Sequence, residues 1–90
     1  MSVFFTRTTF RGRVQGVGFR IQTLDIAKGF DVSGFVRNEV DGSVTLEAEG
    51  VEPEVRAFCE AVGEELGTYI RSSDSTSGTR EPEFAGFHIR

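Results

Sequence analysis

The sequence passes from a predicted strand to a predicted helix through a glycine-rich stretch, GRVQGVGFR, at residues 12–20. Before it, residues 3–13 alternate loosely between apolar or β-branched and charged side chains, which is typical of a strand. The stretch itself has too many glycines for the interior of either regular element. After it, buriable side chains recur at spacings of four, three and four residues: Phe19, Thr23, Ile26 and Phe30. This spacing predicts an amphipathic helix of about three turns.

Two further strands follow this helix, joined by a tight turn. Residues 32–38 are rich in β-forming side chains and predict a second strand. The Asp-Gly pair at 41–42 favours a hairpin turn. Beyond the turn, residues 44–49 alternate apolar and polar side chains, which predicts a half-buried strand that ends at Gly50.

The rest of the chain predicts a second helix and two more strands. Pro53 suits the first position of a helix. The apolar side of that helix has residues at helical spacing: Val55, Phe58, Val62 and Leu66. The lone Cys59 lies beside them and is interpreted as a small core residue. A short fourth strand is expected from Tyr69, because the Ser/Thr-rich run at 72–79 lacks apolar anchors and favours a hairpin or mobile loop. Residues 84–89 form the last strand.

The order β-α-β-β-α-β, with room for an extra short strand, predicts an α+β ferredoxin-like sandwich. In this fold two helices cover one face of an antiparallel sheet. The first two strands are joined through a helix, so they run parallel. The loop at 14–19 and the strand end at Arg37 and Asn38 are therefore expected at the same edge of the sheet. With no repeat or linker in ninety residues, we expect a single domain over residues 1–90 and a monomer.

Composition and charge exclude several classes of function. Fourteen acidic against ten basic residues give a net charge of −4, which argues against a general nucleic-acid binder. No run approaches the ~20 apolar residues of a membrane span. Arginines at 7 and 11 interrupt any signal-peptide core, so a cytoplasmic protein without membrane or nucleic-acid partners is expected. One cysteine and one histidine, His88, leave no plausible zinc set.

The glycine-rich stretch is a candidate anion site. Glycines between a strand and a helix allow successive backbone N–H groups to form a concave anion site. The helix N-terminus adds unpaired N–H groups, and Arg20 in the first turn adds a planar fork suited to phosphate. A bound anion would also relieve the conflict between Arg20 and the helix dipole. The alternative is an ordinary glycine loop with a solvated arginine. The spacing matches neither a Walker loop nor a dinucleotide fingerprint.

Three segments together closely resemble the acylphosphatases: GRVQGVGFR at 12–20, GFVRN at 34–38 and DGSV at 41–44. The resemblance extends over nearly the whole chain. The family consists of small ferredoxin-like enzymes that hydrolyse carboxyl-phosphate mixed anhydrides without metal or cofactor. The resemblance implies a small-molecule acyl phosphate substrate whose phosphoryl group is bound by backbone amides. The residues it implies for this binding are Gln15, Gly16, Val17, Gly18, Phe19 and Arg20. It also implies that Arg20 holds the phosphate and that Asn38 positions the attacking water.

This chemistry suits a site without histidine, cysteine or metal. Phosphoryl transfer depends mainly on positioning and on charge stabilisation at the equatorial oxygens. The leaving carboxylate has a conjugate acid with a pKa of about 4, so it departs without a proton. Water that attacks a metaphosphate-like centre needs orientation more than deprotonation. The absence of an obvious acid-base pair is therefore compatible with an enzyme.

Several alternatives remain open on the sequence. The carboxylate of Glu39, next to Asn38, either points to solvent or weakens anion binding. Arg13 and Arg37 are interpreted as rim charges that could also strengthen the local positive field. The fold could bind a phosphorylated ligand without turning it over, or bind RNA on its sheet, as Gly34-Phe35-Val36 faintly suggests. The chain could also be one domain of a larger carbamoyl-transfer protein.

Overall fold

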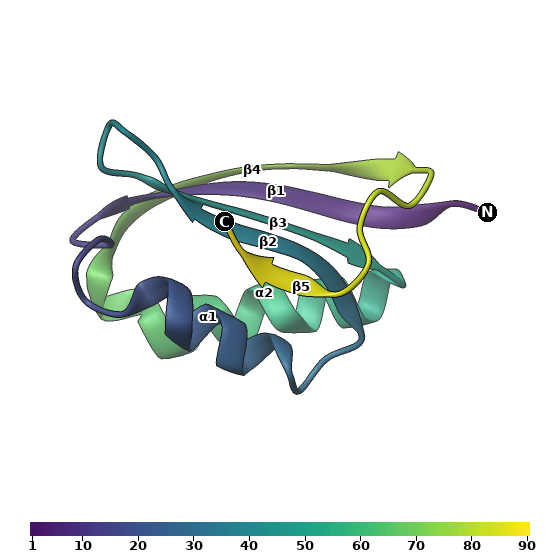
Figure 1. The fold of residues 1–90 in the computed structure, drawn as a ribbon, viewed down its shortest axis with the longest axis horizontal. Helices are drawn as coiled ribbons and strands as arrows, with labels where there is room; N and C mark the ends of the chain where they lie inside the picture. Colours follow the sequence, from purple (N-terminus) through teal and green to yellow (C-terminus); the bar gives the residue numbers. More distant parts are fainter.

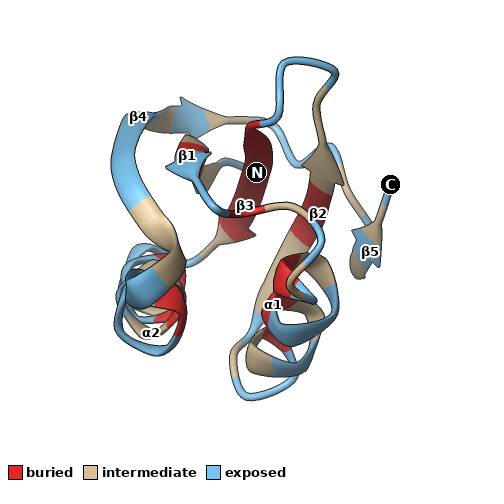
Figure 2. Ribbon diagram, turned by 90° about the vertical axis from the view of Figure 1, so that its left-hand side faces the viewer, coloured by how far each residue is buried: buried red, intermediate tan, exposed pale blue.

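In the computed structural model, which describes residues 1–90, five strands form one sheet in the order β4-β1-β3-β2-β5. Two helices cover one face of this sheet (Figures 1 and 2). In chain order the elements are β1 (Val3–Gly12), α1 (Phe19–Ala27), β2 (Val32–Asn38), β3 (Val44–Gly50), α2 (Glu52–Leu66), a short 3-10 turn (Gly67–Tyr69), β4 (Ile70–Arg80) and β5 (Phe87–Ile89). The α+β ferredoxin-like prediction is confirmed. Pro53 is the second residue of α2 rather than the first.

The direction of the strands brings the β1–α1 loop to the end of β2. Both β1 and β2 pair antiparallel with β3, so they run parallel to each other as predicted. The loop that leaves β1 and the turn that leaves β2 therefore lie at the same end of the sheet, on the left in Figure 1.

The sheet is mixed, and not purely antiparallel as the sequence led us to expect. The additional strand, β5, pairs parallel with β2, with Phe35 opposite His88. The reason is topological. Since β4 runs antiparallel to β1, the chain leaves Arg80 at the end of the sheet where β2 begins. A segment that returns from there along the free edge of β2 runs in the same direction as β2.

The Ser/Thr-rich run at 72–79 is a strand, so its prediction as a hairpin or mobile loop is wrong. It belongs to β4, which is eleven residues long and pairs with β1 along its length. Hydroxyl groups link the two strands on the helix-facing side: Thr6 bonds Ser77 at 3.0 Å and Thr8 bonds Ser75 at 2.8 Å. An edge strand held by its backbone ladder and by hydroxyl pairs needs no apolar anchors. The sequence pattern missed it for that reason.

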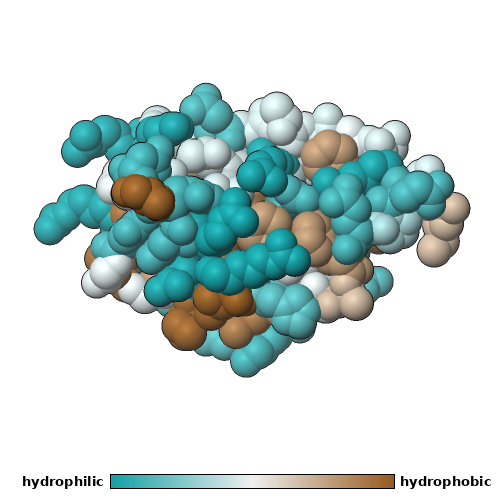
Figure 3. Space-filling view, turned by 45° about the horizontal axis from the view of Figure 1, so that its top comes forward, coloured by the Kyte–Doolittle hydropathy of each residue, from teal (hydrophilic) through white to brown (hydrophobic).

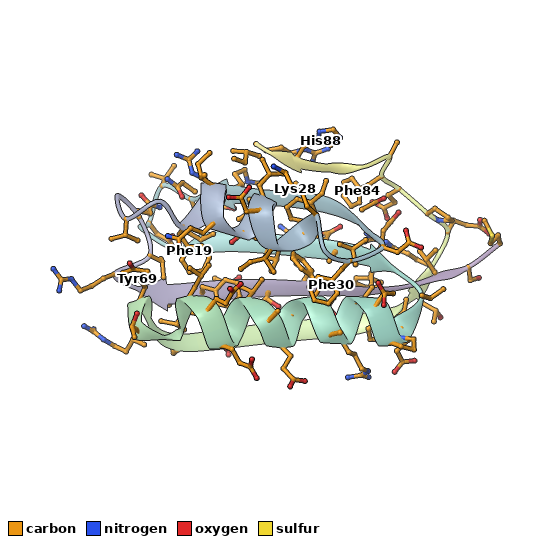
Figure 4. All side chains as sticks on the ribbon, turned by 90° about the horizontal axis from the view of Figure 1, so that it is seen from below. Phe19, Lys28, Phe30, Tyr69, Phe84 and His88 are labelled. Carbon is orange, nitrogen blue, oxygen red and sulfur yellow. The ribbon has the colours of Figure 1, made fainter.

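The core lies between the sheet and the two helices. Its strand residues include Val36, Val44 and Leu46, and α2 contributes the four predicted apolar residues. At the start of α1, Phe19 packs on Phe10 with ring centroids 5.3 Å apart. Just beyond the other end of α1, Phe30 packs on Phe58 at 5.9 Å. Figure 4, which views the molecule from the helix side, shows Phe19 and Phe30 between α1 and α2, over the sheet. This packing fixes both ends of α1, and therefore the position of the loop before it.

The outer face of the sheet is polar but covered, and β3 is buried on both faces instead of half-buried. Glu47 and Glu49 alternate with the core residues of β3, yet their side chains are only 5% and 3% exposed. Arg80 contacts both carboxylates, at 2.8 and 3.0 Å, and Arg7 contacts Glu47 at 2.7 Å. Figure 3 shows this face obliquely, with mainly hydrophilic atoms. Burial of the two glutamates depends on these ion pairs. Neither helix has the length and apolar run needed to cross a bilayer.

Candidate active site

The β1–α1 loop turns into α1 through two glycines in the left-handed region. Gly16 has φ 78° and Gly18, the N-cap of α1, has φ 79°. Side chains with a Cβ rarely adopt this conformation, so the loop needs glycine at both positions. A Cβ at Gly16 would meet no atom within 4 Å. The requirement at Gly16 is therefore one of backbone conformation, and the space beside this residue is open.

A small pocket of about 100 Å³ lies between this loop and the end of β2. Its lining residues are Val14, Gly16, Gly18, Phe19, Arg20, Ile21 and Asn38. Five of these were singled out from the sequence as candidate site residues. The lining contains one cation and no carboxylate, so the pocket suits an anion even though the whole chain is acidic.

Arg20 supplies the positive charge of the pocket. It is the second residue of α1 and lies half-buried beside the free N–H groups of the first helical turn. Its guanidinium forms no hydrogen bond or ion pair with any protein group, whereas Arg7, Arg37 and Arg80 are all paired with glutamates. An unpaired guanidinium and a helix N-terminus on one pocket form a site for a dianion such as a phosphoryl group.

Asn38 reaches the pocket from β2. It is the last residue of that strand and lies on the same face as Val36, which is fully buried against the helices. The Oδ1 atom of Asn38 is buried and has no hydrogen-bond partner in the protein. Buried polar atoms are almost always paired, and such an exception requires an explanation. A water molecule or substrate atom in the adjoining pocket would provide the missing donor.

Two of the predicted phosphate-binding residues do not line the pocket. Val17 is half-buried at the turn of the loop, and its side chain packs against the core. Gln15 is also half-buried, and its side-chain amide donates hydrogen bonds to the carbonyl oxygens of Glu39 at 2.8 Å and Ser43 at 2.9 Å. The side chain of Gln15 thus faces the β2–β3 turn.

Glu39 does not direct its charge into the pocket. Its carboxylate accepts hydrogen bonds from the Thr45 hydroxyl at 2.6 Å and from Arg37 at 3.0 Å. These hydrogen bonds lower the pKa of Glu39, and the one from Thr45 has the larger effect. Arg37 is thereby neutralised on the outer face, where it also stacks on the ring of Phe35 at 5.0 Å. Arg13 is exposed and lies outside the pocket lining.

Val14 and Ile21 also line the pocket, although the sequence did not predict them as site residues. Val14 is fully buried and contributes to the lining of the pocket. Ile21 directly follows Arg20 and is 59% exposed, which makes it the one accessible apolar side chain of the lining. The only signal for these residues was their position, Val14 within the glycine-rich motif and Ile21 directly after it.

A larger hollow between the helices is a weaker candidate. It has a volume of about 440 Å³ and is lined by Gln22, Asp25, Ile26 and Glu65. Two carboxylates and no cation make it unsuited to an anion, and the residues of the glycine-rich loop are absent from its lining. Size alone therefore does not identify the site.

Comparison with known proteins identifies the family. The acylphosphatase family model matches residues 6–89. The chain belongs to the acylphosphatase family. It is 46% identical to the acylphosphatase of Salinibacter ruber over 80 residues, a match that covers 88% of this chain and 84% of the relative.

Solved structures agree with this assignment to the acylphosphatase family. The acylphosphatase from Bacillus subtilis is 32% identical, with a TM-score of 0.75 and coverage of 97% of this chain and 98% of that one. Full-length HypF, in a phosphate- and nucleotide-bound form, is 27% identical with a TM-score of 0.76. That match covers 98% of this chain and 12% of HypF. These relatives favour an enzyme that hydrolyses acyl phosphates over a binding domain without catalytic activity.

Proposed function

We propose that this acylphosphatase hydrolyses acyl phosphates in the pocket between the β1–α1 loop and Asn38. The phosphoryl group occupies the pocket, and water attacks its phosphorus while a carboxylate leaves. The observation that carries the proposal is the pairing, on one small pocket, of an unpaired guanidinium at Arg20 with the orphaned Oδ1 of Asn38. One group attracts the anion, and the other can hold a neutral hydrogen-bond donor such as water.

Residues Gln15 to Arg20 form the phosphate cradle of this proposal. Their backbone N–H groups and the N-terminus of α1 contact the phosphoryl oxygens. The planar guanidinium of Arg20 donates hydrogen bonds to the same oxygens. The negative charge spreads over the equatorial oxygens as the transition state forms, so these fixed donors stabilise it. The left-handed conformations of Gly16 and Gly18 support this role, since they let the backbone curve around the anion.

Asn38 positions the attacking water in this mechanism. Its Oδ1 accepts a hydrogen bond from the water and aligns a lone pair of the water oxygen with phosphorus. As the new P–O bond forms, the bond to the acyl oxygen breaks and the carboxylate departs with the electron pair. The carboxylate needs no proton at neutral pH, and the water proton is released to solvent or to the phosphate product.

The proposal includes no metal ion and no cofactor. The lining of the pocket offers no carboxylate, histidine or cysteine, the side chains that divalent metals prefer. Arg20 supplies the positive charge that a metal ion would otherwise provide. We propose a monomer with a single domain over residues 1–90, in which the sheet and both helices share one hydrophobic core. We also propose a cytoplasmic location, where reducing conditions suit the unpaired Cys59.

Hydrolysis of benzoyl phosphate by the purified protein tests this function. We expect release of inorganic phosphate at a rate that exhaustive treatment with EDTA leaves unchanged. If the protein binds inorganic phosphate but does not hydrolyse benzoyl phosphate, the proposed enzymatic activity is contradicted and the non-catalytic binding domain is favoured. A rate that falls with EDTA and returns with a divalent ion would contradict the metal-free mechanism alone.

A further inference from the structure

The side chain of Gln15 bridges two segments that are far apart in sequence. Its Nε2 atom donates one hydrogen bond to the carbonyl oxygen of Glu39 at 2.8 Å and another to that of Ser43 at 2.9 Å. Glu39 directly follows Asn38, and Gln15 directly precedes Gly16 of the loop. The bridge therefore joins the first residue of the phosphate cradle to the residue beside Asn38. Figure 1 shows the β1–α1 loop and the β2–β3 turn at the same end of the sheet.

The chemistry of the bridge requires a primary amide of this length. The two acceptors are backbone carbonyls, so the nitrogen end of the amide must face them. One NH₂ group carries two donors and satisfies both acceptors at once. Glutamate would place a carboxylate oxygen, which is itself an acceptor, against the two carbonyl oxygens. Methionine would form neither hydrogen bond. Asparagine keeps both donors but is one methylene shorter.

The turn that Gln15 contacts is itself well fixed. The backbone N–H of Glu39 donates to the carbonyl of Ser43 at 2.8 Å, and that of Gly42 donates to the carbonyl of Glu39 at 3.1 Å. The Ser43 backbone N–H and hydroxyl both donate to Asp41 Oδ1, at 2.9 and 2.6 Å. Gln15 thus anchors the loop to a rigid turn, and the anchor point is one residue from Asn38.

We propose that Gln15 is a positioning residue whose side chain fixes the separation between the phosphate cradle and Asn38. This inference rests on the proposed function. Asn38 can orient water toward phosphorus only if the cradle holds the phosphoryl group at a constant distance from it. Misplacement of reacting groups by about 1 Å can cost a factor of about 10² in rate. The bridge acts on geometry and touches neither substrate nor water.

A double-mutant cycle tests this role. Gln15→Met is compared with wild type, and again in the Asn38→Ala background, by steady-state benzoyl phosphate hydrolysis and by competitive inhibition with inorganic phosphate. We expect Gln15→Met to lower kcat by roughly 10- to 100-fold, with an inhibition constant for phosphate changed by less than about threefold. In the Asn38→Ala background, the same substitution should change kcat by less than about threefold. The control is Gln22→Met, which removes one exposed hydrogen bond to Val17 at 3.3 Å and should leave kcat nearly unchanged.

Three outcomes would overturn the proposal. Equal losses in the two backgrounds would show that Gln15 acts independently of Asn38. A large loss of phosphate inhibition would show that the side chain of Gln15 supports phosphate binding itself, and not the separation between the cradle and Asn38. A wild-type rate in Gln15→Met would show that the bridge is dispensable. If Gln15→Met does not fold, Gln15→Asn is used in the same cycle, with a smaller expected loss. Each of these outcomes leaves acyl phosphate hydrolysis by the wild type intact, so they are separable from failure of the proposed function.

Discussion

Arg20, in the first turn of α1, and Asn38, at the last residue of β2, line the same pocket. The guanidinium of Arg20 forms no ion pair or hydrogen bond with the protein. The Oδ1 atom of Asn38 is buried and accepts no hydrogen bond from the protein. The parallel arrangement of β1 and β2 produces this meeting, because both strands end on the side where α1 begins. The fold thus places a cation and a neutral acceptor beside one small space.

Removal of the Arg20 guanidinium is expected to weaken both binding and catalysis. Arg20→Ala should lower kcat and raise the inhibition constant for inorganic phosphate, each by about tenfold or more, because the charge contacts the phosphate before and during reaction. The control is Arg13→Ala, an exposed arginine outside the pocket lining, whose effect should stay within about threefold at physiological salt. Equal effects of the two substitutions would mean that only the net charge matters.

Gly16 should be intolerant of a side chain for reasons of backbone conformation. Gly16→Ala forces a residue with a Cβ into φ 78°, at a cost of about 1–2 kcal/mol. We expect the loop to adopt a different backbone conformation, which should raise the inhibition constant for inorganic phosphate. The matched control is Gly63→Ala within α2, which should raise the free energy of unfolding by about 0.5–1 kcal/mol. Urea unfolding and phosphate inhibition measure both effects, and an unchanged inhibition constant for Gly16→Ala would argue against the cradle.

The free energy of unfolding should decrease at acidic pH because of Glu47. Burial raises the pKa of this carboxyl, but hydrogen bonds from Arg80 and Arg7 outweigh it and lower the pKa below the ordinary 4.5. A carboxyl with a lowered folded-state pKa contributes stability that is present above pH 4.5 and is lost as the pH falls through the folded value. Urea unfolding at decreasing pH should show this loss in the wild type and a weaker one in Glu47→Gln. The exposed Glu52→Gln serves as control, and matching slopes in all three proteins would contradict the prediction.

The sequence predicted the parts of the fold that depend on periodicity and turn chemistry. The spacing from Phe19 to Phe30, the Asp-Gly turn and the bounds of β2 all follow from local rules, and with them the parallel course of β1 and β2. The run at 72–79 could not be recognised, because an edge strand of serines and threonines has no hydrophobic pattern. Burial of Glu47 and Glu49 was equally hidden, since it depends on Arg80 from a strand distant in sequence.

The site could be predicted in part. The glycine-rich motif and Asn38 were identifiable because the family resemblance and the strand order both place them together. The side-chain contacts of Gln15 were not, because they depend on how closely the β2–β3 turn approaches the loop. Pairing of Glu39 with Arg37 and Thr45 required the register of β2 and β3. Such contacts between distant segments depend on the assembled fold, which one sequence does not specify locally.

The central claim, that Asn38 positions water at a phosphate bound elsewhere in the pocket, is tested most directly by Asn38→Ala. The measurement is steady-state hydrolysis of benzoyl phosphate, with the inhibition constant for inorganic phosphate determined on the same folded protein. We expect kcat to fall by roughly 10²–10³, the scale for loss of one preorganised polar group, while phosphate inhibition changes little. A near-normal kcat would remove Asn38 from the mechanism, and loss of phosphate inhibition would instead place it in the cradle.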